Sequence, residues 1–354
     1  MAAYYYYSFI TPAFAAFAAH ACASASLHLS PAALGATTAT RLLPRAAARR
    51  PRRSGPCDRA RSHAIVCLNR LLLDPSECEV DGDTLVARLK PDDHRTLHVK
   101  KQLKAVSGQQ VRAGVLDAGT TDGAVLHWEG DSSEHDTALR IELGPSAPLL
   151  RPLATHERPR IDLLLAMPRP LQFARLLPMI SSMGIGTLWL TGAQRVERSY
   201  FSSHLLKDER EADRQAAILE GLEQSGDTAV PRFVFNKSLR KLLRDEFGAA
   251  DEEGAPPLVK LVCHPERTNS TYGVDGATSE ALRVRRLSDI HVSKGARVVL
   301  AVGPERGWEE PDELALLVSH GFQPVTLGPR TLRTDVAVIS LLAVANDLLL
   351  SKDE

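Results

Sequence analysis

The chain has 354 residues, of which 44% are hydrophobic, and its 43 lysines and arginines balance 43 aspartates and glutamates. This length is sufficient for two domains, each with its own core. No uninterrupted apolar stretch approaches the roughly 20 residues of a transmembrane helix, so no membrane association is expected. The five cysteines show neither a CxxC pair nor zinc-ligand spacing, which predicts a reduced compartment and a site without metal.

Residues 1–62 have a composition of their own. They contain no acid before Asp58, are rich in alanine, serine and threonine, and end in a series of arginines. This composition is typical of an organellar transit peptide, whereas a merely disordered tail usually mixes charges of both signs. Because the first arginine is Arg41, a chloroplast address is favoured over a mitochondrial one.

Removal of residues 1–62 changes the charge balance. Eight arginines and one aspartate lie in this segment, so the remainder has 35 basic and 42 acidic residues, a net charge of −7. Any binding to RNA must then come from local basic patches. One is expected in the first domain and a second around Arg283, Arg285 and Arg286, although a solvated face is the alternative for both; the first patch comprises His94, Arg95, His98, Lys100, Lys101 and Lys104.

Two domains are predicted from the hydrophobic pattern. Residues 63–150 contain short alternating runs separated by turn signals, which indicates a small β-barrel. Residues 151–160 form a linker. From residue 161 to 354 the segments alternate between strands and helices, which predicts an α/β domain with a parallel sheet covered on both faces. The strands are expected at 161–167, 187–192, 232–235 and 258–263, and the helices at 173–185, 207–224 and 239–247.

The C-terminal part repeats one local pattern twice. The run Val298–Val302 predicts a buried strand, and the glycine-rich turn Gly303–Trp308 leads into a helix that begins with acidic residues. Val325–Leu327 predicts the next strand, followed by a second loop, Gly328–Arg333. Thr334 or Asp335 is then expected to cap a helix that ends near residue 350. Two such loops at the same edge of a sheet form a ligand crevice.

These loops carry a resemblance to a known family. GPERGW at 303–308 and LGPRTLRTD at 327–335 are similar to the signature of the RsmE family in the SPOUT superfamily, which methylates N3 of a uridine in 16S-type rRNA. LVCHP at 261–265, EQSG at 223–226 and the stretch 98–119 extend the resemblance. It implies a trefoil knot in the C-terminal domain, a PUA-like barrel before it, a homodimer, and small-subunit rRNA or the 30S-type particle as partner. With the N-terminal composition, it suggests an organellar protein of plant or algal type.

The resemblance also implies the site residues. S-adenosylmethionine is the expected cofactor, held by His264, Pro265, Gly303, Pro304, Glu305, Gly307, Leu327, Gly328, Leu332 and Arg333. Arg333 and Arg330 are the candidate cations for the anion that develops on uracil, and Glu305 is a candidate base. The alternatives are phosphate contact or structural pairing for the arginines, and hydrogen bonds to its own loop for Glu305.

Three departures from the family pattern stand out. Arg306 occupies a usual glycine position and would be strained if that position needs positive φ. Asp335-Val336 replaces Glu-Thr, which keeps the charge, and Asp227 replaces an arginine. These departures leave open a ribosome-assembly factor without catalysis, and a SPOUT enzyme acting on ribose 2′-hydroxyls or on tRNA.

RNA contact is also predicted outside the first domain. The segment 195–201 follows a strand and carries Arg195 and Arg198 beside Tyr200 and Phe201, a combination that suits a splayed base. The alternative is that the two aromatic rings pack under the next helix. The RNA-binding residues expected from the sequence are therefore Arg95, Lys100, Lys101, Lys104, Arg195 and Arg198.

Overall fold

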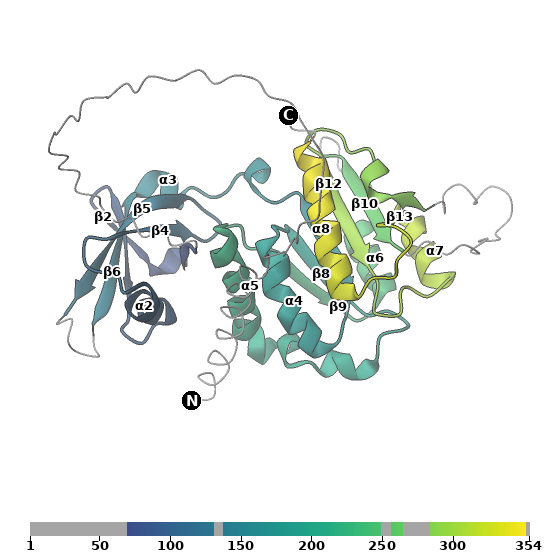
Figure 1. Ribbon diagram of the computed structural model, residues 1–354, viewed down its shortest axis with the longest axis horizontal. Helices are drawn as coiled ribbons and strands as arrows, with labels where there is room; N and C mark the ends of the chain where they lie inside the picture. Colours follow the sequence, from purple (N-terminus) through teal and green to yellow (C-terminus); the bar gives the residue numbers. More distant parts are fainter. Residues whose placement is uncertain (1–68, 131–136, 249–255, 265–283, 352–354) are drawn as a thin grey trace, which may run out of the picture. The chain divides into compact units, whose positions relative to one another are not determined.

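The computed structural model describes residues 69–130, 137–248, 256–264 and 284–351, all within one contiguous unit, Arg61–Glu354 (Figure 1). The predicted transit peptide, residues 1–62, lies outside the described residues. None of the helices in the described ranges is long and apolar enough to cross a membrane.

The first part forms a six-stranded sheet in the order β1-β4-β5-β6-β3-β2. All neighbours are antiparallel except β1 and β4. Leu139, Ile141 and Leu143 are buried and alternate with less buried polar residues, so β6 gives one face to the core. The strands are β1 (Leu71–Leu73), β2 (Cys78–Asp81), β3 (Thr84–Leu89), β4 (Gln110–Val115), β5 (Thr120–Glu129) and β6 (Ala138–Pro145).

Helical turns interrupt this sheet where the sequence predicted only short strands and turns. Asp93 accepts a hydrogen bond from the N–H of Arg95 at 2.8 Å and begins α2 (His94–His98). A π-helical turn, η3 (Val99–Leu103), follows and ends at Lys104 in a left-handed conformation with φ of 50°. The remaining turns of this part are η2 (Pro75–Glu77), α3 (Ser146–Leu150) and η4 (Thr155–Glu157).

The second part is a seven-stranded sheet in the order β11-β13-β10-β12-β7-β8-β9, and all of its pairs are parallel. Every residue of β7 is buried, which requires cover on both faces. The predicted α/β fold with a parallel sheet is thus confirmed. The strands are β7 (Ile161–Ala166), β8 (Thr187–Thr191), β9 (Arg232–Asn236), β10 (Leu258–Cys263), β11 (Arg285–Arg286), β12 (Arg297–Val302) and β13 (Gln323–Thr326).

Helices cover the parallel sheet from both sides. Figure 1 shows α8 near α4, and contacts join these two helices and place α8 against β12 and β7. Phe247 of α6 contacts the rings of Trp189 and Phe322, at centroid distances of 5.0 and 5.4 Å. Since Trp189 alternates with Leu188 and Leu190 along β8, the leucines face the opposite layer. The helices are α4 (Pro170–Ser182), α5 (Glu211–Ser225), α6 (Leu239–Phe247), α7 (Asp312–Ser319) and α8 (Thr334–Leu350).

Three boundaries differ from the sequence prediction. Helix α5 begins at Glu211 instead of residue 207, because 3-10 turns occupy residues 204–206 and 208–210. Strand β13 ends at Thr326, so Leu327 already belongs to the loop. The cap of α8 is Arg333, which makes no side-chain capping bond, and neither Thr334 nor Asp335 takes that position.

Candidate active site

Three neighbouring parallel strands, β13, β10 and β12, end at the same edge of the second sheet. Cys263, the last residue of β10, pairs with Val302 on one side and Val325 on the other. The N–H of His264 donates to the carbonyl of Val325 at 2.9 Å. Because carboxyl ends of parallel strands share one edge, the loops that begin at His264, Gly303 and Leu327 leave the sheet side by side. The structure therefore brings together the starting points of the three predicted ligand loops.

The loop after β12 is folded tightly on itself. Trp308 is fully buried. A Cβ added to Gly303 would lie 3.0 Å from the backbone nitrogen of Trp308 and 3.2 Å from the indole ring of Trp308. Gly307 has φ of 73°, and its N–H donates to the carbonyl of Pro304 at 2.8 Å. Glycine is needed at 303 for close approach and at 307 for the backbone conformation.

Arg306 is not strained in this loop. Among the described residues other than glycine, positive φ occurs only at Lys104 and Asp117. Position 306 therefore does not need glycine, and the doubt that its arginine raised about the loop is removed.

Arg195 holds the β12 loop in place from across β7, the strand that separates β8 from β12. It follows β8, and its Nη1 donates to the carbonyl of Arg306 at 2.7 Å, while its Nε forms a short ion pair with Glu309. Glu313 accepts the N–H groups of Gln194 at 2.7 Å and of Glu309 at 2.8 Å. Arg195 was predicted to bind RNA, but its guanidinium instead binds the β12 loop and holds it in place.

Glu305, the candidate base, lies exposed at the tip of the same loop. Its Oε1 is 3.3 Å from Nε of Arg169, the residue before α4. A hydrogen bond with Tyr200 is the largest cause of the raised pKa of this exposed arginine, and the charge of Glu305 adds to it. No hydrogen bond from Glu305 to backbone amides of its own loop is found in the described part of the chain. Arg169 could not be predicted as a site residue, because its two partners lie far from it along the chain.

His264 faces the protein interior. Its side chain is 3% exposed, and its Nε2 is 2.7 Å from Oε1 of Glu310, which follows the β12 loop. The imidazole therefore joins the β10 and β12 loops. Its neighbour Pro265, also predicted to bind the cofactor, lies outside the described residues.

The third loop, after β13, presents both candidate cations to solvent. Thr326 accepts the N–H of Gly328 at 3.1 Å, and Gly328 has φ of 127°. Arg333 is 77% exposed, and its Nη2 lies 2.7 Å from Oδ2 of Asp335. Arg330 is exposed and has no ion-pair partner within the described ranges. The structural pairing considered for the arginines is therefore present at Arg333, and Arg330 remains available to a ligand.

Cys263 behaves as a structural strand residue. Burial raises the pKa of its thiol far above the ordinary range. A thiol in this state is not a nucleophile at neutral pH. Cys263 is therefore a packing residue of β10 and not a reactive thiol.

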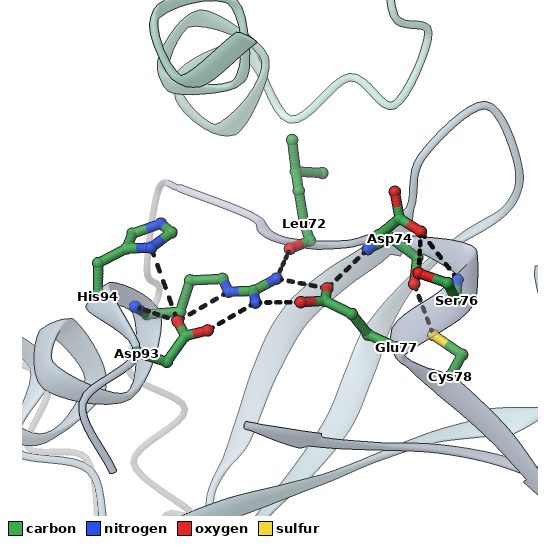
Figure 2. A network of polar contacts seen from close by, with 8 residues as sticks. Leu72, Asp74, Ser76, Glu77, Cys78, Asp93 and His94 are labelled. Atoms are coloured by element: carbon green, nitrogen blue, oxygen red, sulfur yellow. Dashed lines mark hydrogen bonds and ion pairs between the residues drawn. The ribbon is translucent and has the colours of Figure 1, made fainter. Parts of the chain in front are cut away.

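Arg95 departs from its predicted role in RNA binding, because its guanidinium is buried in a polar network. Its Nη1 donates to the carbonyl of Leu72 and to Glu77, both at 2.8 Å, and its Nη2 donates to Glu77 at 2.6 Å and Asp93 at 2.8 Å. Figure 2 shows Asp93 and His94 on one side of this network and Glu77 and Asp74 on the other. With its side chain 10% exposed, Arg95 joins β1, η2 and the start of α2.

The other predicted RNA-binding residues remain at or near the surface. Lys101 and Lys104 are exposed, Lys100 is half-buried with its own interactions, and Arg198 is exposed after β8. Of the second predicted patch, Arg283 lies outside the described residues, whereas Arg285 and Arg286 form the exposed strand β11.

Asp227 has a structural explanation. Gly226 ends α5 in a left-handed conformation with φ of 76°. Oδ1 of Asp227 then accepts the N–H groups of Thr228 at 2.7 Å and Ala229 at 3.0 Å. An arginine has no acceptor with which to make this turn.

The class of protein follows from this fold and from a family match. Residues 156–346 match the family described as RNA methyltransferase domain, which is more than half of the chain. The matched range contains the whole parallel sheet and all three loops. The chain therefore belongs to this family of RNA methyltransferases.

Within the family, particular relatives can be named. The chain is 30% identical over 252 residues to ribosomal RNA small subunit methyltransferase E of Treponema pallidum, covering 71% of this chain and 82% of that protein. Two solved structures share the fold. Ribosomal RNA small subunit methyltransferase E from Neisseria gonorrhoeae, bound to S-adenosylmethionine, is 20% identical with a TM-score of 0.53, covering 79% of this chain and 97% of that chain. A Legionella pneumophila methyltransferase with bound S-adenosylmethionine is 18% identical with a TM-score of 0.51, covering 78% and 97%.

Proposed function

We propose that the protein transfers a methyl group from S-adenosylmethionine to N3 of one uridine in small-subunit, 16S-type rRNA of an organelle. One observation carries this proposal: GPERGW and LGPRTLR follow β12 and β13, which end at the same edge of the parallel sheet on either side of β10, in an RNA methyltransferase. The Treponema pallidum relative is named for small-subunit rRNA, and the Neisseria gonorrhoeae protein binds S-adenosylmethionine.

The loop after β13 suits such a cofactor. Leu327 and Leu332 are 38% and 37% exposed, although leucine side chains are usually buried. Between them Gly328 has no side chain, so a ligand can approach the backbone of the loop closely. An apolar surface beside such a backbone fits a purine ring. We assign the opposite wall to Gly303, Pro304 and Gly307, and the β10 side to the backbone of His264.

The remaining chemistry falls to charged side chains. S-adenosylmethionine supplies a methyl group that is already activated for transfer. Uracil N3 carries a weakly acidic proton, so the protein must accept that proton and stabilise the anion spread over O2, N3 and O4. In this proposal Arg333 stabilises the anion, Arg330 contacts the RNA beside it, and Glu305 accepts the proton while Arg169 orients its carboxylate.

The finer features belong to the same proposal. A C-terminal trefoil knot, a PUA-like function for the first sheet and a homodimer are implied by the resemblance to the RsmE family. Because N3 of a paired uridine is hidden in the Watson–Crick face, the target must be unpaired or flipped out. The segment 1–62, which has no acid before Asp58, supports a chloroplast address, with the mitochondrion as the alternative. A fluorescent reporter fused to residues 1–62 tests that address.

The test is methylation of small-subunit particles. Purified protein is incubated with S-adenosylmethionine carrying an isotopically labelled methyl group and with particles from cells that lack the protein, and nuclease fragments are mapped by mass spectrometry. A single labelled N3-methyluridine supports the proposal. Label on ribose or on added tRNA would instead support the other SPOUT activities. Failure of the pure protein to bind S-adenosylmethionine would leave a non-catalytic assembly factor.

Replacement of Arg195 with alanine is expected to weaken cofactor binding, although Arg195 itself does not contact the cofactor in this proposal. The variant loses a charged hydrogen bond to the carbonyl of Arg306 and the ion pair with Glu309. A charged hydrogen bond contributes roughly 1.5–3 kcal/mol. Without it the loop must be ordered when the cofactor binds, and this cost should raise the Kd about tenfold or more. Isothermal titration with S-adenosylmethionine measures this change.

The matched control is Arg210→Ala. This exposed arginine pairs only locally, with Asp213 at 2.8 Å, and should leave the Kd unchanged. Equal affinities for Arg195→Ala and the unmodified protein would mean that the β12 loop holds its conformation without Arg195.

A further inference from the structure

A hollow lies at the carboxyl ends of β8 and β9, outside the three loops assigned to the cofactor. Its volume is about 530 Å³, within the roughly 300–1,000 Å³ that is common for small-molecule sites. Three segments far apart in sequence line it: the loop after β8, the start of α6, and the start of α7. Its chemistry is set by Arg198, Phe201, Lys237, Leu239, Arg240 and Glu313.

The hollow lies at the same edge of the sheet as the cofactor loops and shares wall residues with the β12 loop region. All strands of the sheet are parallel, so the ends of β8 and β9 lie at the same edge as the end of β12. Helix α7, which lines the hollow, follows directly on the β12 loop. The N–H of Gln194 in the wall donates to Glu313 at 2.7 Å. A ligand in the hollow would therefore lie next to the loop that carries Glu305 and Arg306.

The hollow is rich in cations that have no acidic partner. Arg198, Lys237 and Arg240 are all exposed, and in the part of the chain that the structure describes none of them forms an ion pair. The lining also holds two carboxylates: Glu313 accepts two backbone N–H groups, and Asp312 is exposed, so the three cations exceed the carboxylates by one charge. Although the chain without residues 1–62 carries a net charge of −7, three exposed cations so close together favour an anionic ligand at this place.

An aromatic ring lies between these cations. The Phe201 ring is half-buried, backed by Phe235 at a centroid distance of 6.2 Å and approached by Nζ of Lys237 at 6.0 Å. Glycine at position 192 allows Lys237 and Phe201 to lie this close to the β8 loop, because a Cβ there would lie 2.2 Å from the carbonyl of Lys237 and 3.0 Å from Phe201. Both rings pack against the core, and of the two only Phe201 also lines the hollow, whereas Tyr200 bonds to Arg169.

We propose that this hollow binds a nucleotide of single-stranded RNA next to the methylated uridine. The base stacks on Phe201 and contacts Leu239, and the flanking phosphates contact Arg198, Lys237 and Arg240. Stacking on an aromatic ring together with cations along the backbone is how single strands are held without sequence readout. The inference rests on the proposed function, since it identifies where that RNA enters beside the methyl-transfer site.

The test compares four purified full-length proteins in binding to a fluorescent single-stranded RNA of mixed sequence. Phe201→Leu, which keeps an apolar side chain, is expected to weaken binding about tenfold. Arg240→Ala is expected to lower the slope of log affinity against log salt by about 0.7, the value for one lost phosphate contact. Lys241→Ala is the matched control, because Lys241 is exposed beside Arg240 and does not line the hollow.

The outcomes separate this inference from the proposed function. Affinity and salt slope of Phe201→Leu and Arg240→Ala equal to those of Lys241→Ala would overturn the inference, even if the enzyme methylates uridine N3. A selective loss of RNA binding supports it, even if the methylated atom proves to be another one. Thermal unfolding of Phe201→Leu, and titration with S-adenosylmethionine, verify that the variant is folded and that the cofactor loops are unaffected.

Discussion

Replacing Arg333 with alanine is expected to lower kcat for uridine methylation by about 10²–10³-fold, with little change in KM for the ribosomal particle. Loss of one donor aimed at a developing anion commonly has this effect, because the interaction is stronger in the transition state than in the ground state. Arg333 caps α8 at the end of the β13 loop and is 77% exposed, so its guanidinium can reach a substrate. Single-turnover rates with saturating cofactor measure the change directly.

The ion pair with Asp335 supplies the control for Arg333. If Arg333 acts only by holding Asp335 at 2.7 Å, then Asp335→Asn should be as damaging, and the double variant should be no worse than either single one. If Arg333 acts on the substrate, Asp335→Asn should lose much less than Arg333→Ala. Arg330→Ala should raise KM and leave kcat nearly unchanged, since a phosphate contact contributes equally to ground and transition states. A normal kcat for Arg333→Ala would remove it from the chemistry.

The buried parallel strands could be predicted from sequence because burial on both faces leaves a continuous apolar run. Ile161–Ala166 and Arg297–Val302 are of this kind, and prediction and structure agree to within a residue. The start of strand β13 was predicted too late in the sequence. The strand begins at Gln323, an exposed residue that pairs with Leu261 of β10. Local hydrophobicity cannot predict where a strand begins when its first residue is polar and exposed.

The loops that carry the family motifs were recognised from sequence, whereas the partners of their side chains were not. Arg195 and Glu309 are 114 positions apart, and only the parallel order β12-β7-β8 brings them together. Arg95 belonged to a basic stretch of sequence that suggested a surface patch. Its acidic partner Glu77, 18 positions away, lies in another turn, and local charge patterning cannot reveal such a pair.

Arg95→Ala is expected to lower the free energy of unfolding by about 3 kcal/mol. Removing one member of a buried ion pair usually costs about 3–5 kcal/mol, because the remaining charges are left uncompensated. The lower end applies here, since the Glu77 and Asp93 side chains are 33% and 20% exposed. Urea unfolding followed by circular dichroism measures the change. Arg88→Ala is the matched control: Arg88 pairs with Glu79 at 2.8 Å at the surface and should contribute less than about 1 kcal/mol.

The pH dependence of this difference identifies the mechanism. Hydrogen bonds from Arg95 lower the pKa of Glu77 below its ordinary 4.5. Burial acts to raise the pKa of Asp93, but the hydrogen bonds and the charge of Arg95 together lower it below 3.8. A carboxyl with a lowered folded pKa contributes stability that is complete above its unfolded pKa and is lost as pH falls through the folded pKa. The gap between the unmodified protein and Arg95→Ala should therefore be full at pH 7 and shrink as the pH falls below 4.5 for Glu77 and below 3.8 for Asp93. A gap that stays constant through this range would mean that Arg95 stabilises the turn by packing and by its bond to the carbonyl of Leu72, and not through charge.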